Sequence, residues 1–213
     1  MVPTAQFFGP SINRAPRESR SVVLTFDDGP APPFTEQILD ILAEHRISAT
    51  FFLCGKNVER YPDIARRIVR EGHTIGNHTY SHPFLCPRSR KFMADEIDQA
   101  QDAIERVTGI RPIIFRPPYG ARWFGLMSVL RQRGLKMVMW SVMGFDWKYK
   151  TQAIIQAITR RLRPGAVILL HDGHEQPPPE SIDQSSTVEA LPAVIDAATR
   201  AKLTFVPIDK IME

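Results

Sequence analysis

Two adjacent carboxylates, Asp27 and Asp28, follow an apolar run in the segment TFDDGP. Neighbouring anions repel each other, and a plain turn needs at most one of them. For an arbitrary pair, two solvated turn residues are the more common explanation. A divalent metal offers another, because a carboxylate that binds the ion is neutralised and its neighbour can stay ionised near neutral pH. One Asp would then hold the metal, and the other would accept a proton.

The segment HTYSH places His78 and His82 four residues apart. On one turn of helix this spacing puts both imidazoles on the same side, and it matches a common spacing of metal ligands. Taken alone, such a pair is more often two surface or core histidines. Together with one carboxylate of the Asp pair it forms a His2Asp set that leaves positions for water and substrate. Zinc is the leading candidate, with cobalt or another divalent ion as the alternative.

A stiff loop follows Arg116 in the segment FRPPYG. Its two prolines fix φ at about −65°, and a glycine relaxes the chain after Tyr119. Such a wall could present Arg116 as a charge partner and a backbone N–H to a developing oxyanion. A plain proline-rich turn explains this segment equally well.

A third histidine, His171, comes directly after a buried run in ILLHDG. It could be a general acid that protonates a leaving group, but a metal ligand or a core histidine is equally compatible with its spacing. The segment GFDWK adds Asp146, which could raise the pKa of a nearby imidazolium, and Trp147, which could form an apolar wall. Taken singly, packing in the core is the better explanation of Trp147.

Short apolar runs of strand length alternate with segments of helical periodicity. We expect seven strands, at 21–26, 49–54, 74–77, 113–115, 136–142, 166–170 and 203–208. The alternation predicts parallel βα units in either an open doubly wound sheet or a closed barrel. No GxGxxG or GxxxxGK[ST] motif follows the first run, which disfavours a nucleotide-binding sheet. The polar motifs all follow strand ends, where ligand sites of parallel α/β folds form, and this favours the barrel.

Length and composition narrow the class of protein further. The chain has 213 residues, which suits one domain, and its net charge of +4 is carried by scattered Lys and Arg, which disfavours a nucleic-acid partner. Cys54 and Cys86 form no CxxC and predict free thiols. We expect a monomer without a membrane span. The first residues contain no signal-like apolar run, so a cytoplasmic location is expected for the chain as written. A secreted or cell-envelope protein whose export signal had been removed would look the same.

In chain order, TFDDGP, HTYSH, RPPYG, DW and LLHD resemble the motif set of the polysaccharide deacetylases, carbohydrate esterase family 4. The resemblance covers residues 20–213 as one catalytic domain and leaves residues 1–19 as an N-terminal extension. Within the family, the segment ILDILAEHRISATFF resembles the nodulation-type chitooligosaccharide deacetylases most. The resemblance implies a single distorted (β/α)7 barrel with its active site at the C-terminal ends of the strands.

The resemblance also implies roles for the residues of the first two motifs and for the arginine. Asp27 would be the general base and Asp28 the metal ligand. His78 and His82 would complete the protein ligands of zinc or a similar ion. Arg116 would tether and orient Asp27.

The remaining motifs would supply the acid and the walls of the site. His171 would be the general acid, and Asp146 would tune it. The backbone N–H of Tyr119 would stabilise the oxyanion. Trp147 and Leu169 would line the pocket for the acetyl methyl group.

The implied reaction is metal-dependent hydrolysis of N-acetyl groups on N-acetylglucosamine-containing oligo- or polysaccharides, of chitooligosaccharide or peptidoglycan type, with release of acetate. An O-acetyl xylan esterase of the same family is an alternative that the sequence does not separate. A catalytically inactive sugar-binding relative is disfavoured, because all the acid, base and ligand residues are present. A metallopeptidase fits worse, because HTYSH lacks the Glu of HExxH.

One position departs from the family pattern. Many relatives carry an acidic residue three positions before the Asp of DW, where this chain has Met143. A substrate or loop contact made by that acid is therefore in doubt here, whereas the metal and acid–base residues are unaffected.

Overall fold

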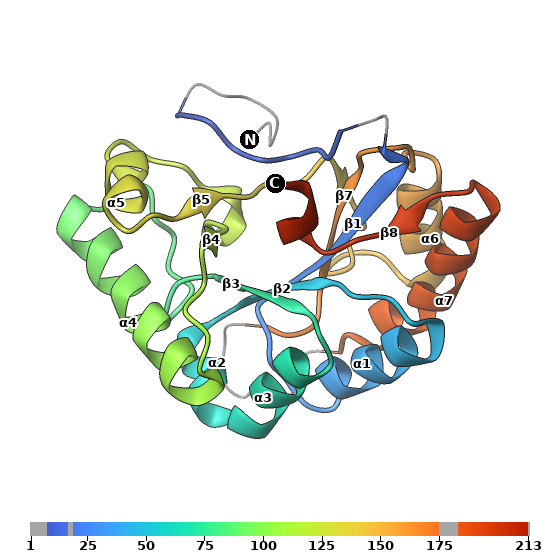
Figure 1. Ribbon diagram of the computed structural model, residues 1–213, viewed down its shortest axis with the longest axis horizontal. Coiled ribbons are helices and arrows are strands. Elements are labelled where there is room, and N and C mark those ends of the chain that lie inside the picture. The colour runs from blue at the N-terminus through green and yellow to red at the C-terminus, as the bar shows by residue number, and fades with distance from the viewer. Residues whose placement is uncertain (1–7, 17–18, 175–182, 213) are drawn as a thin grey trace.

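The computed structural model describes residues 8–16, 19–174 and 183–212 (Figure 1). Its centre is an eight-stranded sheet in the order β5-β4-β3-β2-β1-β7-β6, with β8 paired to β1. The ladders between these strands are parallel. The strands are β1 Ser21–Asp27, β2 Thr50–Leu53, β3 Thr74–Asn77, β4 Ile114–Phe115, β5 Lys136–Met137, β6 Val142–Met143, β7 Val167–His171 and β8 Thr204–Phe205.

Helices run round the outside of the curled sheet, from α5 and α4 on the left of Figure 1 to α7 and α6 on the right. They are α1 Phe34–His45, α2 Gly55–Arg60, α3 Pro62–Arg70, α4 Arg90–Thr108, α5 Leu126–Gln132, α6 Thr151–Thr159 and α7 Ser185–Arg200. Two short 3₁₀ helices are η2 Pro118–Gly120 and η4 Ile208–Ile211. Within the described residues, none of the helices has the length and apolar character that crossing a membrane requires.

The central strand β1 shows how the sequence separates the core from the site. Val22, Leu24 and Phe26 belong to one apolar cluster, whereas Val23 belongs to a second one. Successive side chains of a strand point to opposite faces, so the face of Val23 is also the face of Asp27. A buried strand thus carries a carboxylate to the inner mouth of the sheet.

The distorted barrel predicted from the family resemblance is confirmed as a curled parallel sheet that forms a half-barrel. The run 136–142, predicted as one strand, is instead two strands, β5 and β6, at opposite edges of the sheet. Residues 138–141, which connect β5 to β6, therefore cross the open side of the half-barrel. There the N–H of Ile12 donates to Met137 O (2.9 Å) and the N–H of Ala15 donates to Gly165 O (2.9 Å).

The N-terminal extension predicted for residues 1–19 thus has some residues beside the sheet, while residues 1–7 and 17–18 lie outside the described part. The boundary at residue 20 stays a prediction. As predicted, Cys54 and Cys86 are thiols that form no disulfide within the described residues.

Candidate active site

The two carboxylates at the end of β1 have different partners. Asp28 adopts a φ of 79°, in the left-handed region, so the chain turns sharply as the strand ends. Asp27 faces Arg116, whereas Asp28 faces the two histidines of HTYSH. The repulsion expected of adjacent anions is offset because each carboxylate has its own cationic or ligand environment.

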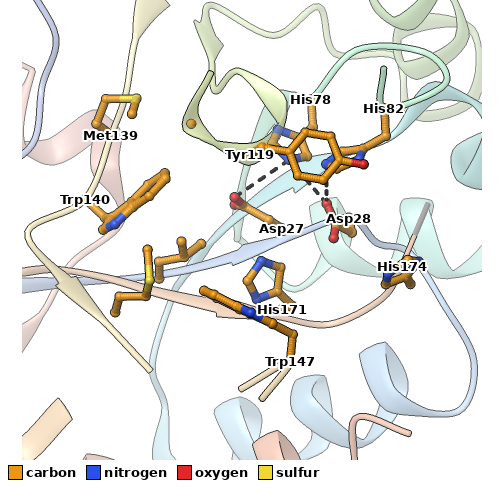
Figure 2. A pocket seen from close by; sticks show the side chains of 13 residues that line it. Asp27, Asp28, His78, His82, Tyr119, Met139, Trp140, Trp147, His171 and His174 are labelled. Atoms are coloured by element: carbon orange, nitrogen blue, oxygen red, sulfur yellow. Dashed lines mark ion pairs between the residues drawn. The ribbon is translucent and has the colours of Figure 1, made fainter. Parts of the chain in front are cut away.

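Asp28, His78 and His82 form a buried cluster whose ligand atoms all lie within 4.8 Å of one another. Asp28 Oδ1 lies 3.2 Å from His78 Nε2 and 3.1 Å from His82 Nε2 (Figure 2). Burial would raise the pKa of Asp28, but the two histidines outweigh burial and hold that pKa well below its usual value. The predicted ligand set is therefore assembled in space.

The predicted geometry of HTYSH is wrong in one respect. The segment is not a helical turn: it follows β3 as a loop in which Thr79 and His82 have positive φ values of 68° and 53°. These two residues bend the chain back on itself and bring the imidazole centroids of His78 and His82 to 4.9 Å. The ligand spacing is thus met by an irregular backbone that helical periodicity does not describe.

The donor set fits a divalent ion of zinc type. Asp28 Oδ1 is buried and has no hydrogen-bond partner within the described residues, as expected of an oxygen that a cation would bind. His78 Nδ1 lies 2.7 Å from the carbonyl oxygen of Arg116. A proton on Nδ1 would donate to that carbonyl and leave the lone pair of Nε2 for the ion. One carboxylate oxygen and two imidazole nitrogens suit zinc, cobalt and their neighbours.

Arg116 is fully buried and holds Asp27 in place. Its Nη1 donates to Asp27 Oδ1 (2.6 Å) and to Thr25 Oγ1 (2.8 Å), and its remaining nitrogens donate to the carbonyls of Val138 and Met139. Burial lowers the pKa of Arg116, and the nearby carboxylate of Asp27 offsets only part of this effect. The guanidinium nevertheless stays charged at neutral pH. Asp27 Oδ2 lies 3.7 Å from His78 Nε2, so the second oxygen faces the ligand cluster.

His171 stands at the end of β7 and is paired with Asp146. Its Nδ1 lies 2.9 Å from Asp146 Oδ1, and its backbone N–H donates to Asp146 Oδ2 (2.7 Å). Burial would lower the pKa of His171, but Asp146, together with the smaller effects of Asp28 and Asp27, outweighs burial, and the pKa rises to about 10. The compact ligand cluster found within the described residues does not include His171, which lines the cavity beside it.

The pairing with Asp146 predicts how activity depends on pH. A general acid works while protonated, so activity should fall as pH rises through the pKa of His171. In Asp146→Asn the carboxylate that opposes burial is lost, and the alkaline limb of the pH–rate profile should move down by at least about one pH unit. An unchanged alkaline limb would show that Asp146 does not tune His171.

The same pair affects folding. Because the folded pKa of His171 is raised, the pair stabilises the fold fully below the unfolded value of 6.5 and loses this effect as pH rises through about 10. Wild type and Asp146→Asn should therefore converge in free energy of unfolding at strongly alkaline pH. Urea unfolding at several pH values measures this.

A cavity of about 440 Å³ joins these groups. It is lined by Asp27, Asp28, His78, His82, Tyr119, Gly120, Met139, Trp140, Met143, Trp147, Leu169, His171 and His174 (Figure 2). Of the ten predicted site residues, eight line this cavity, and the other two, Arg116 and Asp146, support Asp27 and His171 from behind. Their individual roles stay predictions.

The prediction that Trp147 packs in the core is wrong. Its side chain is 55% exposed, and its ring meets that of His171 edge-on with centroids 5.2 Å apart. It lies just beyond β6, at the mouth of the curl, where an apolar ring can cover the cavity without being enclosed. The pocket role implied by the family resemblance is compatible with this position.

Sequence reasoning missed part of the pocket wall. Met139 and Trp140 lay within a run interpreted as one strand, and the break between β5 and β6 lets both line the cavity. Gly120 has a φ of +63°, and a Cβ there would lie 2.6 Å from the Trp140 ring. Met143, which departs from the pattern implied by the family resemblance, also lines the cavity and adds an apolar thioether to its wall.

Asp172, the residue after His171, also follows a predicted strand, but the sequence gives it no role. Its Oδ1 accepts from the N–H of Gly29 (3.1 Å) and its Oδ2 accepts from Thr35 Oγ1 (2.7 Å), all fully buried. Burial raises its pKa to about 7. These bonds connect the loop after β1 with the end of β7. The sequence contained a signal, since LLHD carries two polar residues and only the histidine had an assigned role.

Gly29→Ala is expected to break this connection. A Cβ at Gly29 would lie 2.0 Å from Asp172 Oδ2, so one of the two buried segments must shift. We expect a loss of about 1–3 kcal/mol in the free energy of unfolding, together with reduced metal affinity. Gly72→Ala is the control, because its Cβ meets nothing within 4 Å and only left-handed strain is added. Equal stability of Gly29→Ala and wild type would contradict the steric argument.

Comparison with known proteins agrees with this geometry. The sequence pattern of the polysaccharide deacetylase family matches residues 14–138. A peptidoglycan-N-acetylglucosamine deacetylase of Bacillus cereus is 39% identical over 173 residues, which are 79% of this chain and 63% of that protein. A chitooligosaccharide deacetylase of Rhizobium leguminosarum bv. trifolii is 38% identical over 193 residues, which are 87% of this chain and 88% of that protein.

Solved structures show the same relationship. The crystal structure of a peptidoglycan N-acetylglucosamine deacetylase with a bound naphthalenyl N-hydroxybenzamide superposes with a TM-score of 0.86 at 35% identity. The match covers 93% of this chain and 91% of that one. From the motifs, the curled sheet and the buried Asp-His-His cluster together with these similarities, we conclude that this chain belongs to the polysaccharide deacetylase family.

Proposed function

We propose that this protein hydrolyses the N-acetyl group of N-acetylglucosamine residues in oligo- or polysaccharides of chitooligosaccharide or peptidoglycan type and releases acetate. The observation that supports this most directly is the buried Asp28-His78-His82 cluster. In the same cavity, this cluster lies beside Asp27, which is bound by Arg116, and His171, which is bound by Asp146. The substrate class comes from the relatives, which are named for these two kinds of glycan.

We further propose that zinc is the ion that Asp28, His78 and His82 hold. Two imidazole nitrogens and one carboxylate oxygen form a set that zinc binds readily while keeping a position open for other ligands. When bound, the ion would polarise the acetyl carbonyl and lower the pKa of water. Cobalt suits the same donors, so the metal content of the purified protein decides between them.

The chain's own residues would carry the proton transfers. Asp27, ionised and oriented by Arg116, would accept a proton from the attacking water. At the same time the oxygen of that water would bond to the acetyl carbon. The N–H of Tyr119 would donate to the carbonyl oxygen while negative charge develops there. His171 would donate a proton to the nitrogen as the carbon–nitrogen bond breaks, so that acetate and an amine leave.

The walls of the cavity would position the acetyl group. Trp147, Leu169 and Met143 line the cavity. Their apolar side chains would contact the methyl group of the acetyl. We also propose, from the sequence, that the active form is a monomer.

A substrate panel tests the proposal. Acetate and free amine are measured from chitooligosaccharides, peptidoglycan fragments and acetylated xylan, before and after chelation. We expect acetate and amine in equal amounts from one of the first two, lost on chelation and restored by zinc. Acetate without amine from xylan would instead identify an O-acetyl esterase. No acetate from any substrate by metal-loaded protein would indicate a catalytically inactive sugar-binding relative.

A further inference from the structure

Two exposed aromatic rings adjoin the cavity on the side of the metal ligands. Phe84 is 47% exposed and Tyr119 is 56% exposed, and their ring centroids lie 5.7 Å apart. The Tyr119 ring also meets His82 edge-on at 4.7 Å. His82, Tyr119 and Phe84 thus form a row that leads from a buried ligand to the surface. Only the first two line the cavity, so Phe84 extends this row beyond it.

Both rings stand on backbone that is held in place. Phe84 lies between His82 and Leu85, which are both buried. Tyr119 lies within η2, where the N–H of Gly120 donates to Pro117 O (3.0 Å) and the N–H of Ala121 donates to Pro118 O (2.9 Å). Because the backbone beneath both rings is held in this way, a ligand that covers them does not have to order that backbone.

We propose that Phe84 and the outer part of Tyr119 form a binding subsite for a sugar ring that neighbours the N-acetylglucosamine residue in the cavity. This inference rests on the proposed function. One face of a β-linked glucosamine ring presents only C–H groups, and such a face packs on an aromatic ring without needing a charge or a hydrogen bond. Tyr119 belongs to both the cavity and the subsite, so a glycan leaving the cavity on this side must pass over Phe84.

The size of this surface argues against a protein partner. A stable protein interface buries about 800 Å² on each partner, far more than two neighbouring rings supply. A single exposed phenylalanine needs no functional explanation, but this one continues a row that begins at a metal ligand.

The test compares Phe84→Ala with Phe124→Ala. Phe124 is also exposed (64%), but its ring contacts Phe8 and Trp123, neither of which lines the cavity. We expect Phe84→Ala to raise KM for penta-N-acetylchitopentaose about three- to tenfold with kcat unchanged. Activity on an aryl acetate, which has no neighbouring sugar, should not change. Phe84→Tyr should restore the wild-type KM, and Phe124→Ala should match wild type on both substrates.

Three results would overturn the subsite: an unchanged KM in Phe84→Ala, an equal rise in Phe124→Ala, or an equal loss on the aryl acetate. Calorimetric titration with the same pentasaccharide separates this inference from the proposed function. If wild type binds the sugar but no substrate of the panel releases acetate, the function fails, and the ratio of Kd values for Phe84→Ala and wild type still decides the subsite. If wild type does not bind the pentasaccharide at all, the subsite fails, and the substrate panel still decides the function.

Discussion

Asp27→Asn is expected to keep its metal and to lose turnover by about 10²–10⁴-fold, the usual contribution of a general base. The amide cannot accept the proton of water, while the Asp28-His78-His82 cluster is left intact. Metal content by mass spectrometry and kcat on a chitooligosaccharide measure the two effects separately. If metal and activity disappear together, Asp27 is a ligand and the division of roles between the two carboxylates is wrong.

The same substitution leaves the buried charge of Arg116 without its anion. Breaking a buried ion pair in this way costs about 3–5 kcal/mol, which an amide oxygen offsets in part by accepting a hydrogen bond. Activity must therefore be measured where circular dichroism shows folded protein. Asp40→Asn is the matched control, since Asp40 pairs with Arg67 on the exposed surface and should change neither turnover nor metal content.

His78→Ala is expected to reduce bound metal from near stoichiometric to background and to abolish turnover. The substitution removes one of two nitrogen donors and also the contact between His78 Nδ1 and the carbonyl of Arg116. Metal content after dialysis and activity after adding back zinc are the measurements. His45→Ala, on the exposed end of α1, is the control and should behave as wild type.

Equal metal content in wild type and His78→Ala would refute the assigned ligand set. Retained metal with lost turnover would instead give His78 a role in the reaction itself. Removing His78 leaves His82 and the more weakly acting His171 to hold the charge of Asp28, so the pKa of Asp28 should rise toward its usual range.

Much of this protein is determined by the sequence itself. Alternating strand and helix patterns imply parallel βα units, and parallel strands end at one mouth. Asp27, His78, Arg116 and His171, each placed at a strand end, therefore converge without knowledge of which strands are neighbours. The alternation of side chains along β1 likewise places Val22, Leu24 and Phe26 on one face of the strand and Asp27 on the other.

The tertiary structure alone decides the partners and the irregular backbone. Arg116 meets Asp27, and Asp172 meets Gly29, across elements far apart in the chain, because strand order brings those ends together. Asp28 and His82 have positive φ, which local propensity disfavours in residues other than glycine, so no periodic pattern predicts how their side chains meet. The sequence thus determines which chemical groups reach the mouth, whereas long-range packing and these strained turns determine which atoms come into contact.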